Sequence, residues 1–284
     1  MLVDLNQNTT EWEAFRRNKI GASDVPVIMG VSPWSSPIQL WEQKLGIVPP
    51  KIKTFRMQRG SDLESTALRC FNEKHGLSLQ PQVIICRSYP WAMSSLDGID
   101  VEMKTILEIK CPGEVDHKQA CYGQVPDKYI PQLMHQMFCA EVEFAYYYSF
   151  DGENGVTLKV ERDDEYIKKM IEKELEFYKC LSEFIPPRMT ENDYIIKNDP
   201  DWKEASERYL NVKMQLSALE KLEETYRLDL LKKASGNSCK GSGVRLTKYV
   251  KRGTVDYKNI PEIQSVDLDQ YRKNPIISWR ISEE

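Results

Sequence analysis

The stretch from residue 92 to residue 112, AMSSLDGIDVEMKTILEIKCP, constrains the fold more than any other part of this sequence. A first strand-like run ends at Asp97, and a second covers residues 106–110, ILEIK. Because side chains alternate along a strand, Glu108 and Lys110 share one face, while the alternate apolar residues can fill a core on the other. If the two strands adjoin, Asp97 comes close to Glu108, with Lys110 one pleat further on.

This grouping of charges suits one kind of chemistry and also has an ordinary structural explanation. Two carboxylates hold a hard divalent cation such as Mg²⁺, which acidifies bound water and stabilises charge on a phosphate under attack. A neighbouring lysine can orient or deprotonate that water. Asp-Gly is, however, a strong hairpin-turn signal by itself, and Glu-x-Lys is common on a solvated strand face. The spacing alone leaves both interpretations open.

The order of these residues, Asp followed by Glu-x-Lys, resembles the PD-(D/E)xK nuclease pattern. The segments LDG and LEIKCP, at 96–98 and 107–112, resemble the lambda-exonuclease-like family, the YqaJ-type phage recombination exonucleases. Three further segments extend the resemblance over roughly residues 10–190: WEAFRRNKIGASD near the N-terminus, GSDLE at 60–64 and YIPQLMHQM at 129–137. The resemblance implies an α/β (α+β) fold, with a restriction-endonuclease-like core in which helices flank a central mixed β-sheet.

The resemblance also implies a catalytic set made of acids, a lysine and a glutamine: Asp97, Glu108, Lys110, Glu64 and Gln132. Asp97 and Glu108, with the carbonyl of Ile109, would hold the metal, which we expect to be Mg²⁺ with Mn²⁺ as a substitute. Lys110 would activate or orient water, and the other two residues would assist.

Glu64 has a second interpretation that needs no catalysis. The residues Ser61-x-x-Glu64 form a capping-box pattern at the start of a helix predicted over 61–75. Helix starts often border functional sites, so the two interpretations are compatible, and we favour the functional one.

Two residues near the N-terminus, Arg16 and Ser23, match the positions that hold the 5′-terminal phosphate of DNA in the family, and Tyr129 matches a position near the DNA. The residues themselves allow this role, since Ser23 can cap a short helix whose free N–H groups suit a phosphate, and Arg16 can add a bidentate contact. A capped helix with a solvated arginine is the structural alternative. The family has a threonine where this chain has Gly21, so one expected phosphate contact is missing.

The composition limits how such a protein holds DNA. The 284 residues carry a net charge of −4, so no global basic bias favours nucleic acid. The resemblance implies double-stranded DNA ends as substrate, a homo-oligomeric ring around the DNA, and a single-strand-annealing recombination protein as partner. A ring would keep an acidic protein on DNA, because topology replaces net attraction.

The absence of long apolar runs and of paired cysteines bears on the location of the protein and on the kinds of metal site it can have. No apolar run reaches the roughly eighteen residues of a membrane span and no signal peptide is evident, so we expect a cytoplasmic protein with no membrane contact. The resemblance implies a bacterial host cell and a phage or prophage origin. The seven cysteines are scattered without a C-x-x-C pair, which argues against a zinc ribbon or an iron–sulfur cluster.

The chain divides into a predicted nuclease core over 1–198 and a C-terminal appendage over 199–284. Apolar residues near heptad spacing predict a long helix or a helical hairpin over 201–233. Because Glu223 breaks the repeat, we do not expect an extended coiled coil. The segment 235–242 reads as a flexible break, and a β-hairpin turning at Gly253 is predicted over 244–258. Its five basic side chains either contact DNA or are simply solvated: Arg245, Lys248, Lys251, Arg252 and Lys258.

These observations predict a Mg²⁺-dependent deoxyribonuclease, a 5′-to-3′ double-strand exonuclease that generates 3′ single-strand overhangs for phage-type homologous recombination. A related PD-(D/E)xK endonuclease would keep the same metal site but lack the end-binding pocket. A non-catalytic DNA-binding or assembly module is a third possibility, in which the acidic face is only solvated.

Overall fold

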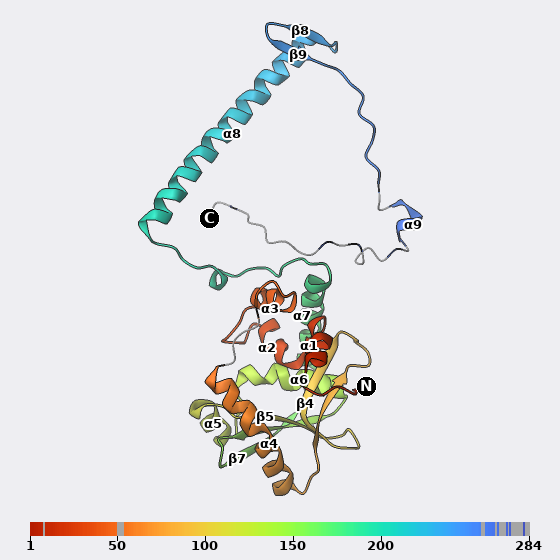
Figure 1. Cartoon of the computed structure of the whole chain (residues 1–284), viewed down its shortest axis with the longest axis vertical. Coiled ribbons are helices and arrows are strands. Elements are labelled where there is room, and N and C mark those ends of the chain that lie inside the picture. Colours follow the sequence, from red (N-terminus) through yellow and green to blue (C-terminus); the bar gives the residue numbers. More distant parts are fainter. Residues whose placement is uncertain are drawn as a thin grey trace. The chain divides into compact units, whose positions relative to one another are not determined.

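The computed structural model describes residues 1–7, 9–49, 54–256, 259–264, 266, 271, 273 and 281. Contacts divide the chain into two units, the first containing Met1–Asp193 and the second Tyr194–Ile276 (Figure 1). The predicted domain boundary after residue 198 stays a prediction, since this division concerns contacts alone.

A mixed β-sheet forms the centre of the first unit, as predicted. In the described residues it has seven strands in the order β1-β3-β4-β5-β6-β7, with β2 paired to β4. The pairs β5–β6 and β2–β4 are parallel and the others are antiparallel. The strands are β1 (Leu2–Val3), β2 (Ile20–Gly21), β3 (Gln80–Ile85), β4 (Ala92–Ile99), β5 (Ile106–Lys110), β6 (Phe144–Phe150) and β7 (Gly155–Glu161).

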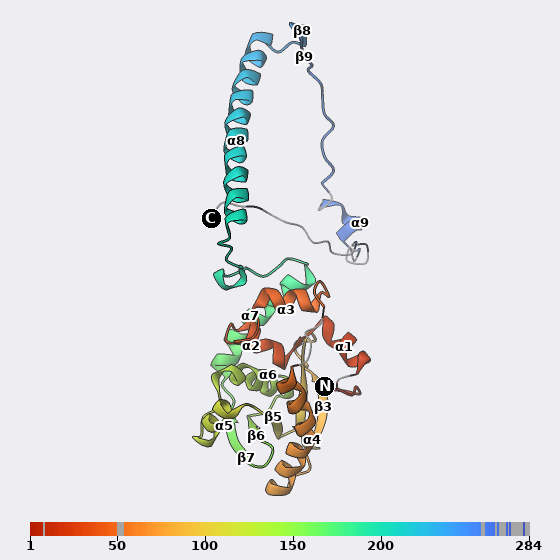
Figure 2. The same cartoon turned by 60° about the vertical axis from the view of Figure 1, so that its left-hand side comes forward.

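Helices cover both faces of this sheet (Figure 1, Figure 2). One face packs against α4, and the other against α6 together with α2 and α7. The helices of this unit are α1 (Thr10–Arg17), α2 (Val25–Ile28), α3 (Pro37–Lys44), α4 (Phe55–His75), α5 (Glu114–Cys121), α6 (Ile130–Ala140) and α7 (Asp164–Ser182), with short 3₁₀ turns η1 (Ala22–Asp24), η2 (Asp127–Tyr129) and η3 (Glu191–Asp193).

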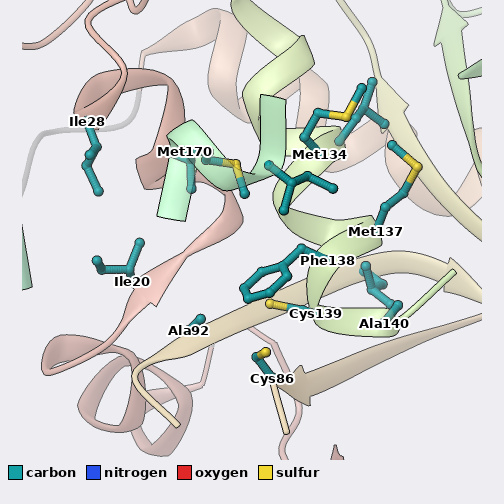
Figure 3. Close-up of a cluster of buried hydrophobic side chains, with 14 of the residues drawn as sticks. Ile20, Ile28, Cys86, Ala92, Met134, Met137, Phe138, Cys139, Ala140 and Met170 are labelled. Carbon is teal, nitrogen blue, oxygen red and sulfur yellow. The ribbon is translucent and has the colours of Figure 1, made fainter. Parts of the chain in front are cut away.

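The alternation along β5 divides the apolar interior into two cores. Leu107 and Ile109 point toward α4 and join Phe71 in the smaller core. Ile106 points the other way and joins the larger core around α6, in which Phe138 holds a central place (Figure 3). Because both faces of β5 are covered, Glu108 lies inside the protein and not on a solvated face.

The helix predicted over 61–75 begins earlier than its sequence pattern indicates. Its first residue is Phe55, and Thr54 caps it by accepting the backbone N–H of Met57 at 3.3 Å. Ser61 therefore lies inside α4, and the capping-box interpretation of Glu64 is wrong. The error arose because Thr54, seven positions earlier, supplies an equally good capping side chain.

The second unit contains one long helix, α8 (Pro200–Ala234), capped by the carboxylate of Asp199. This resolves the choice between a long helix and a helical hairpin. A short hairpin follows, made of β8 (Cys239–Gly241) and β9 (Val244–Leu246). The small helix α9 (Pro261–Gln264) lies further along the chain.

The predicted hairpin over 244–258 is wrong, as is the break over 235–242. Strand β8 lies within that break and pairs with β9 across a two-residue loop, Ser242-Gly243. Both loop residues have positive φ, at 49° and 82°, which is the backbone of a tight hairpin turn. Residues 247–256 form no strand, and Lys258 lies outside the described residues. None of the described helices has both the length and the apolar character needed to cross a bilayer.

Candidate active site

The strands β4 and β5 separate at the point where the predicted acidic residues lie. In residues 92–110 the two strands pair at Gly98 with Leu107 and at Ile99 with Ile106, and the ladder stops there. The next residue outward, Asp97, accepts the backbone N–H of Ile109 at 2.7 Å through its carboxylate Oδ2. The carboxylate of Asp97 thus takes the place of a backbone carbonyl and satisfies a strand N–H group that the ladder leaves unpaired.

Gly98 allows the strands to approach closely just before they separate. A Cβ atom at this position would lie 3.0 Å from the Leu79 Cβ and 3.2 Å from the Leu107 Cβ. Any larger residue would therefore push β4 away from its neighbours and move the carboxylate of Asp97. The Asp-Gly pair marks a fork in the sheet, and not the hairpin turn that was its structural alternative.

Glu108 is buried, with 2% of its surface exposed, and three side chains donate to its carboxylate. Lys110 Nζ and Gln132 Nε2 donate to Oε1, the second at 2.5 Å, and Gln136 Nε2 donates to Oε2. The two glutamines lie one turn apart on α6, so both amides face the same strand. The carboxylate is consequently held in one orientation.

The sequence had not identified Gln136 as part of the site. Its spacing from Gln132, four residues along a predicted helix, was the available signal, but polar helix faces are usually solvated. Only the packing of α6 over β5 shows that this polar face points at a buried carboxylate.

Lys110 remains a cation within the site. Burial by itself lowers its pKa, but the carboxylates of Glu108 and Asp97 raise the pKa of Lys110 above its ordinary value. Its Nζ atom also lies 5.3 Å from the ring centroid of Tyr129.

Three carboxylates around the fork lie near enough to interact electrostatically, namely those of Glu64, Asp97 and Glu108. Burial raises the pKa of Asp97 well above its ordinary value, and the charges of Glu108 and Glu64 raise it further. Burial, followed by the charge of Glu108, also raises the pKa of Glu64 on α4. Crowded carboxylates of this kind are relieved by a divalent cation with oxygen ligands, so the donor set suits such a metal.

The predicted metal ligands therefore fit as a pair of carboxylates with a backbone carbonyl. In the described residues no three His, Cys, Asp or Glu side chains meet in an arrangement that could hold a metal by themselves. Asp97 and Glu108 would supply the carboxylates, and Glu64 lies close enough to affect the charge of both.

A cavity of about 360 Å³ joins the two ends of the predicted site. Lys110, Gln132 and Tyr129 line it together with Ser23, which comes from the N-terminal motif. A second cavity, of about 590 Å³, lies along α4 and has Glu64 and Asp97 in its wall. Lys110, predicted to be catalytic, and Ser23, predicted to bind a phosphate, thus line the same cavity.

Arg16 and Ser23 contact each other, as a shared phosphate site requires. Arg16 Nη2 donates to Ser23 Oγ at 2.7 Å and to Asp24 Oδ1 at 2.6 Å. Ser23 lies within η1 and does not cap it, so the predicted N-cap is wrong. The N-cap of the following helix α2 is Asp24, which makes no side-chain cap bond to that helix. Its Oδ2 instead accepts the backbone N–H of Gly21, the N-cap of η1, at 2.8 Å.

Asp24 also forms a buried ion pair with Lys44 of α3, at 2.8 Å. Although burial raises the pKa of Asp24, the charges of Arg16 and Lys44 outweigh it and lower the pKa to about 2. Neither Asp24 nor Lys44 was predicted from the sequence as part of the site. The acid directly after Ser23 was a signal, but the lysine lies twenty positions further on and offered none.

The departure from the family at Gly21 has a structural counterpart. A Cβ atom on Gly21 would lie 2.9 Å from Arg16 Nε. The guanidinium of Arg16 therefore occupies the space into which a threonine side chain would begin to extend.

Tyr129 forms part of the cavity wall between two lysines. The Nζ atoms of Lys110 and Lys128 both lie 5.3 Å from its ring centroid, and its hydroxyl donates to Asp116 Oδ2 at 3.3 Å. Burial raises the pKa of Tyr129 to about 12, so the phenol stays neutral. Both lysines are ion-paired, Lys110 with Glu108 and Lys128 with Asp116 at 2.7 Å.

The part of the chain that contains the predicted site is similar to a known protein family. Residues 11–143 match the model of the YqaJ-like viral recombinase domain. The resemblance expected from the sequence is confirmed. The matched residues include every residue predicted for the site, from Arg16 to Gln132, and the additional Gln136.

One curated sequence and the solved structures of one exonuclease are also similar to this chain. The uncharacterised protein YqaJ of Bacillus subtilis strain 168 is 29% identical over 233 residues, which cover 74% of this chain and 73% of that protein. The crystal structure of an alkaline exonuclease from Laribacter hongkongensis matches with a TM-score of 0.54 and 26% identity, over 62% of this chain and 94% of that one. The structure of the same exonuclease in complex with dAMP matches with a TM-score of 0.53, at the same identity and coverage. These matches confirm the predicted fold class.

Proposed function

We propose that this chain is a metal-dependent DNA exonuclease that digests double-stranded ends from 5′ to 3′ and leaves 3′ single-strand overhangs. One observation carries the proposal: Asp97, Glu108 and Lys110 meet at a fork of the sheet, beside a cavity that also contains Ser23. The likeness to an alkaline exonuclease, which was also crystallised with dAMP, supports a nuclease.

The metal would be Mg²⁺, with Mn²⁺ as a substitute, held by Asp97, Glu108 and the carbonyl of Ile109. Bound there, it would make a water ligand more acidic and stabilise charge on the scissile phosphate. Glu64 would assist by adding negative charge beside Asp97.

The protein's own groups then orient the reaction. The Lys110 ammonium orients the attacking water and stabilises negative charge that develops on the phosphate. Gln132 lines the same cavity and donates to Glu108, so it would also reach a phosphate bound in that cavity. Gln136 acts as a positioning residue, because it contacts the far oxygen of Glu108 and does not line that cavity.

The pair Arg16 and Ser23 would bind the 5′-terminal phosphate and so determine the polarity of digestion. The carboxylate of Asp24 fixes the guanidinium of Arg16, which reduces the entropy lost when a phosphate binds. Tyr129, between its two lysines, would border the path of the DNA.

The wider assignments belong to the same proposal. The chain would comprise a nuclease domain over 1–198 and an appendage over 199–284. It would act as a homo-oligomeric ring on DNA ends, beside a single-strand-annealing protein, in the cytoplasm of a bacterial host during phage-type recombination.

The central test measures digestion of linear duplex DNA with and without 5′-phosphates, in Mg²⁺, in Mn²⁺ and with a chelator. Asp97→Ala and Lys110→Ala should lower turnover by about 10²–10⁴-fold, as removal of an acid–base or electrostatic group does. The exposed Lys104→Ala serves as the matched control and should digest normally. Normal turnover by Lys110→Ala in Mg²⁺ would refute the site.

The end-binding pocket has its own test. Wild type should prefer phosphorylated ends, and Arg16→Ala should lose most of that preference, whereas Arg17→Ala, on the exposed next position, should keep it. Equal digestion of both kinds of end by wild type would contradict the pocket. Cleavage of covalently closed circular DNA would instead identify an endonuclease.

A further inference from the structure

The long helix α8 exposes an apolar stripe along its length. It spans 35 residues, and Leu216, Leu219 and Tyr226 are 55%, 61% and 62% exposed. The stripe follows a seven-residue repeat through Tyr209, Val212, Leu216, Leu219, Tyr226 and Leu230, interrupted only by Glu223. Repeats of this kind are buried against a partner helix in coiled coils, and a continuous exposed row marks an interaction surface.

We propose that α8 pairs in antiparallel orientation with α8 of a second copy of this chain. The twofold axis would pass between Ser217 and Ala218. Leu216 then packs against Leu219 of the second copy, and by symmetry the same contact occurs again on the other side of the axis. Apolar layers therefore fill the centre of the pair, where burial from water is most complete.

The outer layers also match in this register. Tyr209 packs against Tyr226 of the second copy, which gives two aromatic pairs. Glu223, the one charged residue among these positions, faces Val212 of the second copy and not another carboxylate. Its carboxylate can reach solvent at the edge of the pair through its flexible stem.

The charges that flank the stripe favour this register. Arg208 lies opposite Asp229 of the second copy, and Lys213 lies opposite Glu220 of the second copy. Each attractive pair occurs twice because the arrangement is symmetric. Residues at these flanking positions choose partner and orientation in coiled coils, so the charges are evidence for the occupant.

The other registers place like charges together. In a parallel pair, Arg208 would lie beside Lys213 of the second copy, and Glu223 would face Glu223 across the core. In an antiparallel pair shifted by one heptad, either Lys213 faces Lys213 or Glu220 faces Glu220. Of the registers compared, the one centred between residues 217 and 218 avoids every such repulsion.

DNA does not fit as the occupant of this stripe. Residues 200–234 contain seven acidic and seven basic side chains, so the helix has no net charge to attract phosphates. The exposed residues of the stripe are apolar and aliphatic or aromatic, which suits a second apolar helix. This inference concerns assembly and does not depend on the proposed nuclease activity.

The first experiment measures the mass of the full chain by analytical ultracentrifugation over a range of concentrations. Wild type should self-associate, and Leu216→Glu should halve the mass of the particle. Leu216 is exposed and glutamate favours helices, so the variant should retain its helical circular dichroism. The same mass for both proteins would overturn the proposal, and would mean that another segment or partner covers the stripe.

The second experiment tests the orientation by charge exchange. Arg208→Asp and Asp229→Arg should each weaken association by about tenfold to a hundredfold, since each creates two repulsive contacts. An equimolar mixture of the two variants should associate as tightly as wild type, because opposite charges face each other again. Lys203→Glu, outside the flanking positions, is the matched control and should leave the affinity unchanged.

The same variants distinguish the parallel alternative. In a parallel pair, Arg208→Asp would place an acid beside Lys213 and strengthen association. Tighter self-association of Arg208→Asp alone, or failure of the mixture to recover, would refute the antiparallel pairing.

Discussion

The buried ion pair that supports the N-terminal motif offers a quantitative test of the structure. Asp24 is 7% exposed in its side chain and lies between Arg16, at 2.6 Å, and Lys44, at 2.8 Å. The substitution Asp24→Asn keeps the size of the side chain and removes its charge. It leaves the equally buried Lys44 ammonium without a counter-charge, because an amide cannot balance it.

The size of the effect follows from the pKa. Lowering the pKa of Asp24 from 3.8 to about 2 corresponds to roughly 2–3 kcal/mol of preference for the ionised form in the folded state. Breaking a buried pair by removing one partner costs roughly 3–5 kcal/mol, because the other charge remains buried. We therefore expect Asp24→Asn to lower the free energy of unfolding by about 3 kcal/mol at pH 7.

The pH dependence gives the sign of the effect independently. Because the folded pKa of Asp24 is lower than its unfolded value, its contribution is present above pH 3.8 and is lost as the pH falls toward about 2. The stability gap between wild type and Asp24→Asn should be full at pH 7. It should narrow steadily below about pH 4.

Urea unfolding of the full chain, followed by tryptophan fluorescence, measures this gap. Trp41 and Trp91 lie in the larger core and report its unfolding. The control is Asp164→Asn, since Asp164 forms an exposed pair with Arg162 at 2.6 Å and should cost less than about 1 kcal/mol. A loss below about 1 kcal/mol for Asp24→Asn, or a gap independent of pH, would refute the buried ion pair.

Two further substitutions test the core of the same unit. Burial lowers the pKa of His135, but the charge of Glu174 acts in the opposite direction and the folded pKa is raised, so the pair stabilises the fold fully below about pH 6.5 and less as the pH rises through the folded pKa. Glu174→Gln should therefore cost more stability at pH 6 than at pH 9. An equal cost in thermal melts at the two pH values would contradict the charged pair. Gly155→Ala should destabilise by roughly 1–3 kcal/mol, because its Cβ would lie 1.8 Å from the Tyr148 hydroxyl, whereas Gly113→Ala, with no atom within 4 Å, should be nearly neutral in the same urea assay.

The sequence determined the local elements of the site because local patterns report periodicity. The alternation in residues 106–110 identified a strand and placed Glu108 and Lys110 on one face, and the order Asp, Glu-x-Lys indicated that Asp97 would lie near them. The helical spacing of residues 129–137 placed Gln132 on a helix. Each of these signals lies within a few residues of chain, so no long-range contact was needed to read it.

Where local signals competed, the sequence led to errors that tertiary packing corrects. Two capping patterns compete at the start of α4, and Thr54 is used in place of Ser61. Two glycine-containing turns compete in the appendage, and the chain turns at Ser242-Gly243 because both residues adopt positive φ. The choice depends on small differences in free energy that a pattern does not contain.

Only the tertiary structure decided which polar residues are buried together. Asp24 and Lys44 are twenty positions apart, and Glu108 and Gln136 are twenty-eight apart, yet each pair is in contact. Such pairs form because helices cover both faces of the sheet. A polar side chain that the sequence pattern assigns to the solvent can therefore contact a neighbouring helix or strand instead. Burial strengthens their electrostatic interactions, and that burial is a property of the packed layers and not of any one segment.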